Sequence, residues 1–169
     1  MKRVVIALVL VTAVAWTATP ANAVGFHAIY WDGEDIDKGY GAGVKHKIGL
    51  LWPISVDLRA SWVRFGDAEL NTFPLEAVLR MKILKFYAGF GLGYYIFDQK
   101  DIKVDNAIGS FVAGGAEFAP FGLGFFAELR YHWLKTESEG VIGGAGGSTA
   151  KADLSANGLG IGLGVLWSW

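Results

Sequence analysis

The sequence predicts an all-β fold, an eight-stranded antiparallel up-and-down β-barrel whose strands cross a membrane. Three observations lead to this prediction. Of the 169 residues, 53% are hydrophobic and 24 are glycine, a composition that is strongly apolar and unfavourable for helices. Large apolar residues recur at every second position in segment after segment, which is the period of a β-strand. The connections between these segments alternate between short and long, as expected of a transmembrane barrel.

The N-terminal segment, residues 1–23, is predicted to be a cleaved secretory signal peptide. Lys2 and Arg3 form a positive start, residues 4–16 are an apolar run broken only by Thr12, and Ala21-Asn22-Ala23 is a small-x-small cleavage site. The apolar run is shorter than the roughly 20 residues that a transmembrane helix needs. We therefore expect Sec-type export and assign residues 24–169 to the barrel domain.

The first four strands show the two-residue period in the N-terminal half of the barrel domain. They are expected at residues 24–31, 40–48, 54–62 and 73–82. The first is the least regular, with Phe26, Ala28 and Tyr30 on its apolar face. In the fourth, Pro74 cannot donate a ladder hydrogen bond, so we expect it near the outer start of the strand or at a bulge.

The last four strands show the same period, and the final one shows it most clearly. They are expected at residues 86–97, 111–118, 123–133 and 159–169. In the final segment every odd position from Leu159 to Trp169 is large and apolar, whereas the even positions are Gly, Leu or Ser. A helix would scatter these side chains around its circumference, while a strand places them on one face.

The connections predict the orientation of the barrel. Tight turns are expected near residues 50–53, 82–85 and 119–122, and longer polar or glycine-rich loops near 32–38, 66–72, 98–106 and 134–153. Short turns belong to the periplasmic side of such barrels and long loops to the outside, so both ends of the barrel domain should be periplasmic. Residues 143–147, within the longest connection, are predicted to be a flexible tip.

The face opposite the apolar one combines glycine with charges of both signs. These predicted lumen charges are Lys45, Asp57, Arg59, Glu76, Arg80, Glu117, Glu128 and Arg130. In a soluble sandwich or lipocalin-like barrel this face would be the exterior, which seldom carries so much glycine. Small residues and paired charges instead suit the narrow interior of an eight-stranded barrel, so we expect a largely plugged lumen.

Aromatic residues on the apolar face fall at two depths, as expected at the two interfaces of a membrane. The predicted interface aromatics are Tyr40, Trp62, Tyr94, Tyr131 and Trp133 near the outer ends of the strands, and Trp52, Phe118, Trp167 and Trp169 near the inner ends. Their predicted role is anchoring in lipid. His46 also falls on the apolar face, close to the inner interface, where partial hydration lowers its cost.

The cleavage site, the eight alternating segments and the terminal aromatic residue together resemble the small eight-stranded outer-membrane barrels of Gram-negative bacteria, the family of the transmembrane domain of outer membrane protein A. In that family a terminal aromatic preceded by alternating apolar residues resembles the signal read by the barrel-assembly machinery, and Trp169, Trp167 and Val165 fit it. The resemblance implies an outer-membrane location after export. It also implies a monomer that contacts outer-membrane lipids and lipopolysaccharide.

The predicted function is therefore a structural or surface-interaction role in the outer membrane, without enzymatic activity, catalytic residues, cofactor or metal. A formal net charge of -1 provides no basic field for nucleic acid. One alternative is a narrow channel for ions or small solutes, lined by the lumen charges. The second alternative is a lipid A-modifying acyl hydrolase built on His132, although the Ser of the expected His-x-Ser pair is replaced by Leu134 and only Ser138 and Glu128 remain as partners.

Two further surface features were weighed for binding. Asp32, Glu34, Asp35 and Asp37 cluster in the first long loop and could hold a hard cation such as calcium, but solvated loop charge is the simpler interpretation. Arg64, beside Trp62 at the outer rim, could contact a lipopolysaccharide phosphate.

Overall fold

A computed structural model describes residues 23–66, 70–99, 103–119, 123–142 and 148–168. Except for Ala23, the predicted signal peptide lies outside the described residues, as do Trp169, the tip at 143–147 and most of the turn at 119–122. Within the described part, no helix is long and apolar enough to cross a bilayer.

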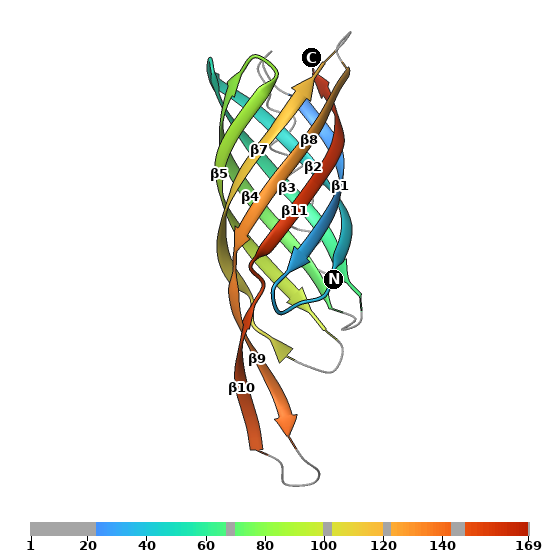
Figure 1. The fold of residues 1–169 in the computed structure, drawn as a ribbon, viewed down its shortest axis with the longest axis vertical. Coiled ribbons are helices and arrows are strands. Elements are labelled where there is room, and N and C mark those ends of the chain that lie inside the picture. Colours follow the sequence, from blue (N-terminus) through green and yellow to red (C-terminus); the bar gives the residue numbers. More distant parts are fainter. Residues whose placement is uncertain (1–22, 67–69, 100–102, 120–122, 143–147, 169) are drawn as a thin grey trace.

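The described strands form a closed barrel, which confirms the predicted all-β fold class (Figure 1). Its eight strands are β1 (Ala23–Gly33), β2 (Gly39–Leu51), β3 (Ile54–Phe65), β4 (Asn71–Ile83), β5 (Phe86–Asp98), β7 (Ala107–Phe118), β8 (Leu123–Trp133) and β11 (Gly158–Ser168). Each pairs antiparallel with its neighbour in the barrel.

Closure depends on the first and last strands. β1 and β11 pair along their full lengths, from Ala23 opposite Ser168 to Gly33 opposite Gly158. A closed ladder gives the backbone amides of every barrel strand partners on both sides, so none of these strands is an unpaired edge. β1 begins at Ala23, the residue that the sequence assigns to the end of the signal peptide.

The longest connection is more ordered than the sequence predicted. It contains β9 (Lys135–Ile142) and β10 (Ser148–Ser155), which pair from Lys135 opposite Ser155 to Ile142 opposite Ser148. The short strand β6 (Lys103–Val104) joins β9, and the β9–β10 hairpin projects from the barrel (Figure 1). The apolar alternation that marks the barrel strands is absent here because a hairpin beyond the barrel wall has no lipid-facing side to bury.

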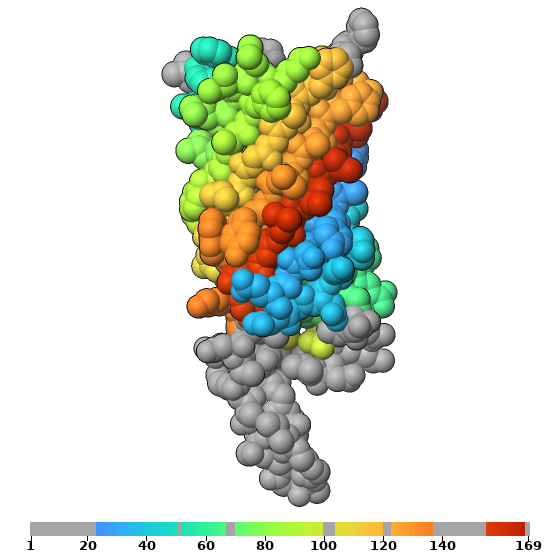
Figure 2. All heavy atoms as spheres, in the orientation of Figure 1, coloured from blue at the N-terminus to red at the C-terminus, as the bar shows by residue number. Residues whose placement is uncertain are grey.

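The barrel is apolar outside and encloses many buried charged side chains, the reverse of a soluble protein. Outward positions carry exposed large apolar side chains on every strand of the wall, among them Phe26, Trp62, Leu79, Phe90, Val112, Leu129 and Leu163. Figure 2 shows one side of this wall, where β8, β11 and β1 pack into a continuous surface. The two-residue period predicted which side chains face outward, including Phe26 and Ala28 on the irregular first strand.

Two residues, Pro74 and His46, fit the alternating pattern poorly. Pro74 lies near the start of β4, and the β3–β4 pairing runs through Ala60 opposite Leu75 and resumes at Val63 opposite Thr72. The interruption lies beside the proline, which has no N–H to donate. His46 occupies an outward position of β2, between Val24 on β1 and Leu58 on β3, and its side chain is buried.

The turn between β4 and β5 has an unusual residue. Ile83 pairs with Phe86, so only Leu84 and Lys85 form the turn, and Leu84 has a φ of 57°. This left-handed conformation favours Gly, Asn or Asp, and a branched side chain there costs about 1–2 kcal/mol. Leu84 is also 87% exposed, so no packing within the described protein compensates for the strain.

Replacing Leu84 with Asn should stabilise the barrel. Asn tolerates the left-handed region, so we expect the free energy of unfolding to rise by about 0.5–1 kcal/mol. Urea unfolding in detergent micelles measures the change. The matched control is Leu50→Asn, at an exposed position next to the other described tight turn without a positive φ, which should bring no gain. Equal effects of the two substitutions would contradict the strain at Leu84.

Candidate functional site

The loop end of the lumen is filled by a cluster of buried, mostly apolar side chains. Its members are Ile29, Trp31, Val63, Phe65, Leu70, Tyr95, Phe97, Ala107, Leu134 and Ala156. Val63, Phe65 and Tyr95 are completely inaccessible to solvent, and Ile36 and Val104 from the connecting segments pack against the cluster. These residues form an apolar plug at the long-loop end of the barrel.

His132 connects this plug to the charges below it. Its ring stacks on Trp31 at a centroid distance of 4.3 Å and on Phe111 at 5.0 Å. The hydroxyl of Tyr95 lies 3.1 Å from His132 Nδ1 and donates to Glu76 Oε1 at 3.2 Å. His132 is therefore held inside the barrel between two aromatic rings.

Glu128 on β8 is the acceptor at the centre of the lumen. Arg59 on β3 donates to both of its oxygens, from Nη1 at 2.7 Å and from Nη2 at 2.8 Å. Tyr87 on β5 donates its hydroxyl to Glu128 Oε2 at 2.8 Å, and Arg130 Nε donates to Oε1. The two-pronged Arg59–Glu128 pair crosses the lumen and ties opposite walls together.

Asp57 on β3 is the second hub. Its carboxylate contacts three cations: Arg80 Nη1 at 2.8 Å, Arg59 Nη2 at 3.1 Å and Lys45 Nζ at 3.2 Å. Lys45 Nζ also lies 3.7 Å from the centre of the Phe126 ring, a cation–π contact. Every polar group here is buried, so each charge depends on these contacts for its stability.

Glu117 on β7 closes the network at the short-turn end. It accepts from Arg80 Nη2 at 3.0 Å, Lys47 Nζ at 2.8 Å and Lys82 Nζ at 2.9 Å. Arg80 thereby links Glu117 to Asp57, and Arg130 links Glu128 to Glu76 through Nη1 at 3.0 Å. The network is continuous from the plug to the inner mouth.

The eight charges expected in the lumen all lie there, buried and joined in this network. They are Lys45, Asp57, Arg59, Glu76, Arg80, Glu117, Glu128 and Arg130. Lys47 and Lys82, which the sequence places on the same face, complete it.

Sequence reasoning singled out His132 but missed the inward aromatic residues and His27. Tyr87, Tyr95 and Phe111 contact the charged network directly, and His27 Nε2 lies 3.2 Å from Ser61 Oγ. Their positions in the alternation would have identified them, since each follows the inward period of its strand. An inward aromatic residue next to an outward one, as Tyr87 is next to Phe86, differs little from it in hydropathy. The alternation between apolar and polar residues is therefore hard to see at such positions.

Glycine creates the space that these large side chains occupy. A Cβ on Gly91 would overlap the ring of Phe111, and a Cβ on Gly115 would lie 2.7 Å from the hydroxyl oxygen of Tyr87. The inward glycines therefore leave room for the neighbouring aromatic rings, so that a narrow lumen can hold both these rings and the ion pairs.

The predicted interface aromatics point outward wherever the structure describes them. Tyr40, Trp52, Trp62, Tyr94, Phe118, Tyr131, Trp133 and Trp167 are all exposed. Trp169 lies outside the described residues, and Trp167 and Val165 lie near the end of β11. Their predicted roles in lipid anchoring and in barrel assembly remain predictions.

The acidic first loop is tied to the base of the β9–β10 hairpin. Asp35 Oδ2 accepts from the Ser155 backbone amide at 3.1 Å, and Glu34 Oε2 accepts from Ser155 Oγ at 3.1 Å and from Asn157 Nδ2 at 3.3 Å. In the described part of the chain, no group of three or more His, Asp or Glu side chains could hold a metal ion. Here the carboxylates serve as hydrogen-bond acceptors that position the hairpin.

The fold is shared with one solved outer-membrane barrel, and two further structures align less well. The crystal structure of the outer membrane protein OprG from Pseudomonas aeruginosa aligns with a TM-score of 0.69 at 12% identity, covering 90% of this chain and 97% of that chain. A chain from the de novo design of transmembrane β-barrels aligns at 0.49 with 12% identity, covering 90% of this chain and 98% of that one. The KdgM porin aligns at 0.33 with 9% identity, covering 87% and 99% respectively.

The likeness to OprG supports the expected resemblance to small outer-membrane barrels at the level of fold, and at this identity it shows the fold alone. The two lower TM-scores carry no argument. No protein-family description matches the chain, and no curated protein matches it by sequence.

Asp57→Asn should destabilise the barrel strongly. The substitution leaves Lys45, Arg59 and Arg80 without their shared carboxylate, and breaking a buried pair costs about 3–5 kcal/mol of unfolding free energy. Urea unfolding in micelles measures this loss. Adding Lys45→Met to the same variant removes one surplus charge and should recover part of it. Arg64→Gln, an exposed charge on the same strand, is the control, and a loss at Asp57 no larger than at Arg64 would contradict the network's importance.

Proposed function

We propose that this chain is an integral outer-membrane β-barrel of a Gram-negative bacterium with a structural or surface-interaction role and a plugged lumen. The observation that carries the proposal is the inversion of polarity: an apolar, lipid-compatible exterior surrounds buried charges. In a bilayer, such a closed barrel satisfies every ladder hydrogen bond internally while its outer side chains meet hydrocarbon. The shared fold with OprG supports the same placement.

Two successive barriers favour a plug over a channel. A solute entering from the loop side meets the dry cluster around Val63, Phe65 and Tyr95. Beyond it, the Arg59–Glu128 and Arg80–Asp57 pairs bridge strands of the wall. Side chains fill the interior of eight-stranded barrels, and open aqueous lumens belong to barrels of roughly 16 strands or more.

The long-loop side supports the surface-interaction part of the proposal. The β9–β10 hairpin extends past the barrel (Figure 1), and its base is fixed by the first loop through Glu34 and Asp35. Leu134 N also donates to Asn157 Oδ1 at 2.8 Å, which joins the two ends of the hairpin. A projecting element on a firm base is suited to present a surface to lipopolysaccharide or to another cell, and Arg64 remains a proposed contact for lipopolysaccharide phosphate.

The remaining biogenesis steps of the proposal come from the sequence. Residues 1–23 would direct Sec-type export, and Trp169, Trp167 and Val165 would be read by the barrel-assembly machinery. The protein is proposed to act as a monomer without cofactor.

The geometry gives the hydrolase alternative no support. His132 lies inside the barrel between Trp31 and Phe111, whereas the acyl chains of lipid A lie outside it. Glu128, one of its two suggested partners, is bound to Arg59, Arg130 and Tyr87. The side chain of Ser138, the other partner, lies outside the described residues.

The plug predicts that the protein does not conduct in a planar bilayer. We expect membranes containing the wild-type chain to show no steady conductance steps, because both the apolar cluster and the ion pairs must move aside for a hydrated ion to pass. Quenching of tryptophan fluorescence by lipids brominated on their acyl chains confirms insertion in the same preparation. Conductance steps that vanish in Glu76→Gln or Arg130→Gln would overturn the plug and support the narrow channel.

The membrane placement itself predicts that the chain requires detergent or lipid to stay dispersed after purification and fractionates with outer-membrane vesicles. Density-gradient fractionation of expressing cells measures this. A detergent-free soluble monomer with Phe90 and Leu163 protected from labelling, once each is replaced by Cys, would contradict the proposal.

A further inference from the structure

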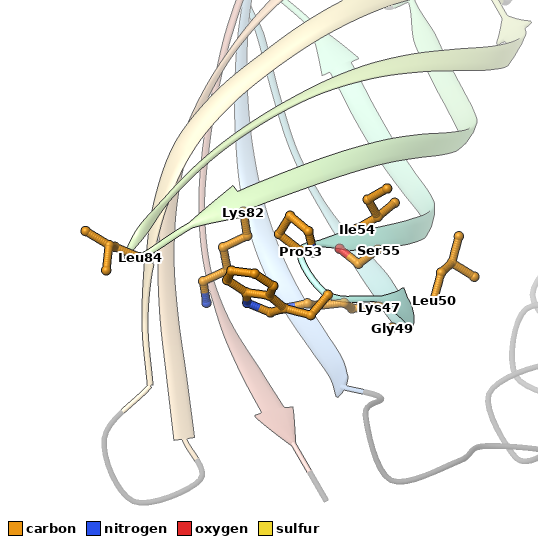
Figure 3. Close-up of a pocket in the computed structure, with 9 residues that line it drawn as sticks. Lys47, Gly49, Leu50, Pro53, Ile54, Ser55, Lys82 and Leu84 are labelled. Atoms are coloured by element: carbon orange, nitrogen blue, oxygen red, sulfur yellow. The ribbon is translucent and has the colours of Figure 1, made fainter.

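A pocket of about 550 Å³ lies at the inner mouth of the barrel, beside the tight turn between β2 and β3. Figure 3 shows its lining, which includes Lys47 on β2, Lys82 on β4 and the turn residue Pro53. Trp52 also lines the pocket. A bulge between Gly49 and Leu51 shifts the β2–β3 register there, which turns the end of β2 away from the regular ladder. The backbone N–H of Lys82 donates to Pro53 O at 2.9 Å and holds the turn against β4.

The polar side of this pocket carries unbalanced positive charge. The lumen network joins six cations, Lys45, Lys47, Arg59, Arg80, Lys82 and Arg130, to four carboxylates, Asp57, Glu76, Glu117 and Glu128. The excess positive charge lies at the short-turn end, where three cations share the single carboxylate of Glu117. These cations are Arg80, Lys47 and Lys82.

The two lysines are also placed to bind something further. Their side chains are 17% and 30% exposed, whereas Lys45, Arg59 and Arg80 above them are buried almost completely. Both Nζ atoms contact the same oxygen, Glu117 Oε1, so they lie close enough together for one phosphate group to reach both. Each ammonium has three N–H donors, more than a single carboxylate oxygen can accept.

The other side of the pocket is apolar and exposed. Trp52 is 88% exposed, and Leu50, Ile54 and Leu84 are also accessible. Leu84 holds its branched side chain outward from a left-handed backbone position, φ 57°, where a polar turn residue would be unstrained. An apolar side chain kept at that position without packing inside the protein indicates contact with an apolar partner.

We propose that this pocket binds an anionic phospholipid, with its phosphate between Lys47 and Lys82 and an acyl chain against Trp52, Ile54 and Leu84. The inference rests on the membrane placement proposed above, which puts the short-turn end at the inner leaflet. A free anion would match the lysines but leave the apolar side uncovered, and an uncharged lipid would leave the surplus charge unmatched. Basic pockets at membrane depth bind anionic headgroups in the same way.

Native mass spectrometry of the full chain in a neutral detergent tests the proposal. Dioleoylphosphatidylglycerol and dioleoylphosphatidylcholine are added at equal concentrations, and the retained lipid adducts are counted. We expect preferential retention of phosphatidylglycerol. Lys82→Gln should weaken that retention about fivefold, because one basic residue near a headgroup contributes about 1 kcal/mol. The matched control is Lys85→Gln, a neighbouring lysine whose Nζ instead lies 4.8 Å from the centre of the Phe118 ring.

Two further measurements distinguish lipid binding from binding of a free anion, and loss of the pocket from loss of the fold. Inorganic phosphate should not displace the bound lipid, and Leu84→Asn should weaken retention although it relieves backbone strain and keeps the barrel folded. Equal retention of both lipids by the inserted wild-type barrel, or equal losses in Lys82→Gln and Lys85→Gln, would overturn the proposed pocket while leaving the membrane placement intact. Failure of the chain to enter micelles at all would instead overturn the membrane placement.

Discussion

Charged side chains inside a barrel this narrow cannot retain their hydration, so each one must find a partner across the lumen. Asp57 and Glu128 meet this requirement as hubs, and between them they contact four cations from four strands. The remaining features of the wall follow from this constraint. On β5 and β7, inward glycines such as Gly91 and Gly115 make room for the rings of Phe111 and Tyr87 beside the charges. The large apolar residues are then left to face outward.

The polarity of the interior side chains changes along the barrel axis. The loop end is dry and apolar around Phe65 and Tyr95, the middle is charged and internally paired, and the short-turn end carries the surplus lysines. His132 lies at the first boundary, stacked on aromatic rings and close to the Tyr95 hydroxyl. This arrangement supports the proposed plugged lumen, and it makes the two rims the accessible places for the proposed binding functions.

The two rims differ in how they are built. At the loop rim, hydrogen bonds from Ser155 and Asn157 to the first loop fix the base of a projecting hairpin. At the turn rim, a bulge and a strained leucine leave an accessible apolar and basic pocket. Leu84 adopts a left-handed backbone conformation that leucine disfavours. Such exceptions to residue preference are expected at sites where a protein contacts a partner.

The two-residue period was sufficient to predict the barrel, its eight strands and the side of the wall on which residues such as Lys45, Arg59 and Leu163 lie, because side-chain direction in a strand depends only on the parity of the position. The same period could not predict the β9–β10 hairpin, which has no lipid-facing side and therefore no apolar alternation. Nor could it predict that Arg59 pairs with Glu128 or that Phe111 lies over Gly91. The Arg59–Glu128 pair depends on closure of the barrel, which brings the opposite strands β3 and β8 within reach of each other. The Phe111–Gly91 contact depends on the register of the neighbouring strands β5 and β7, which places these two residues directly opposite each other.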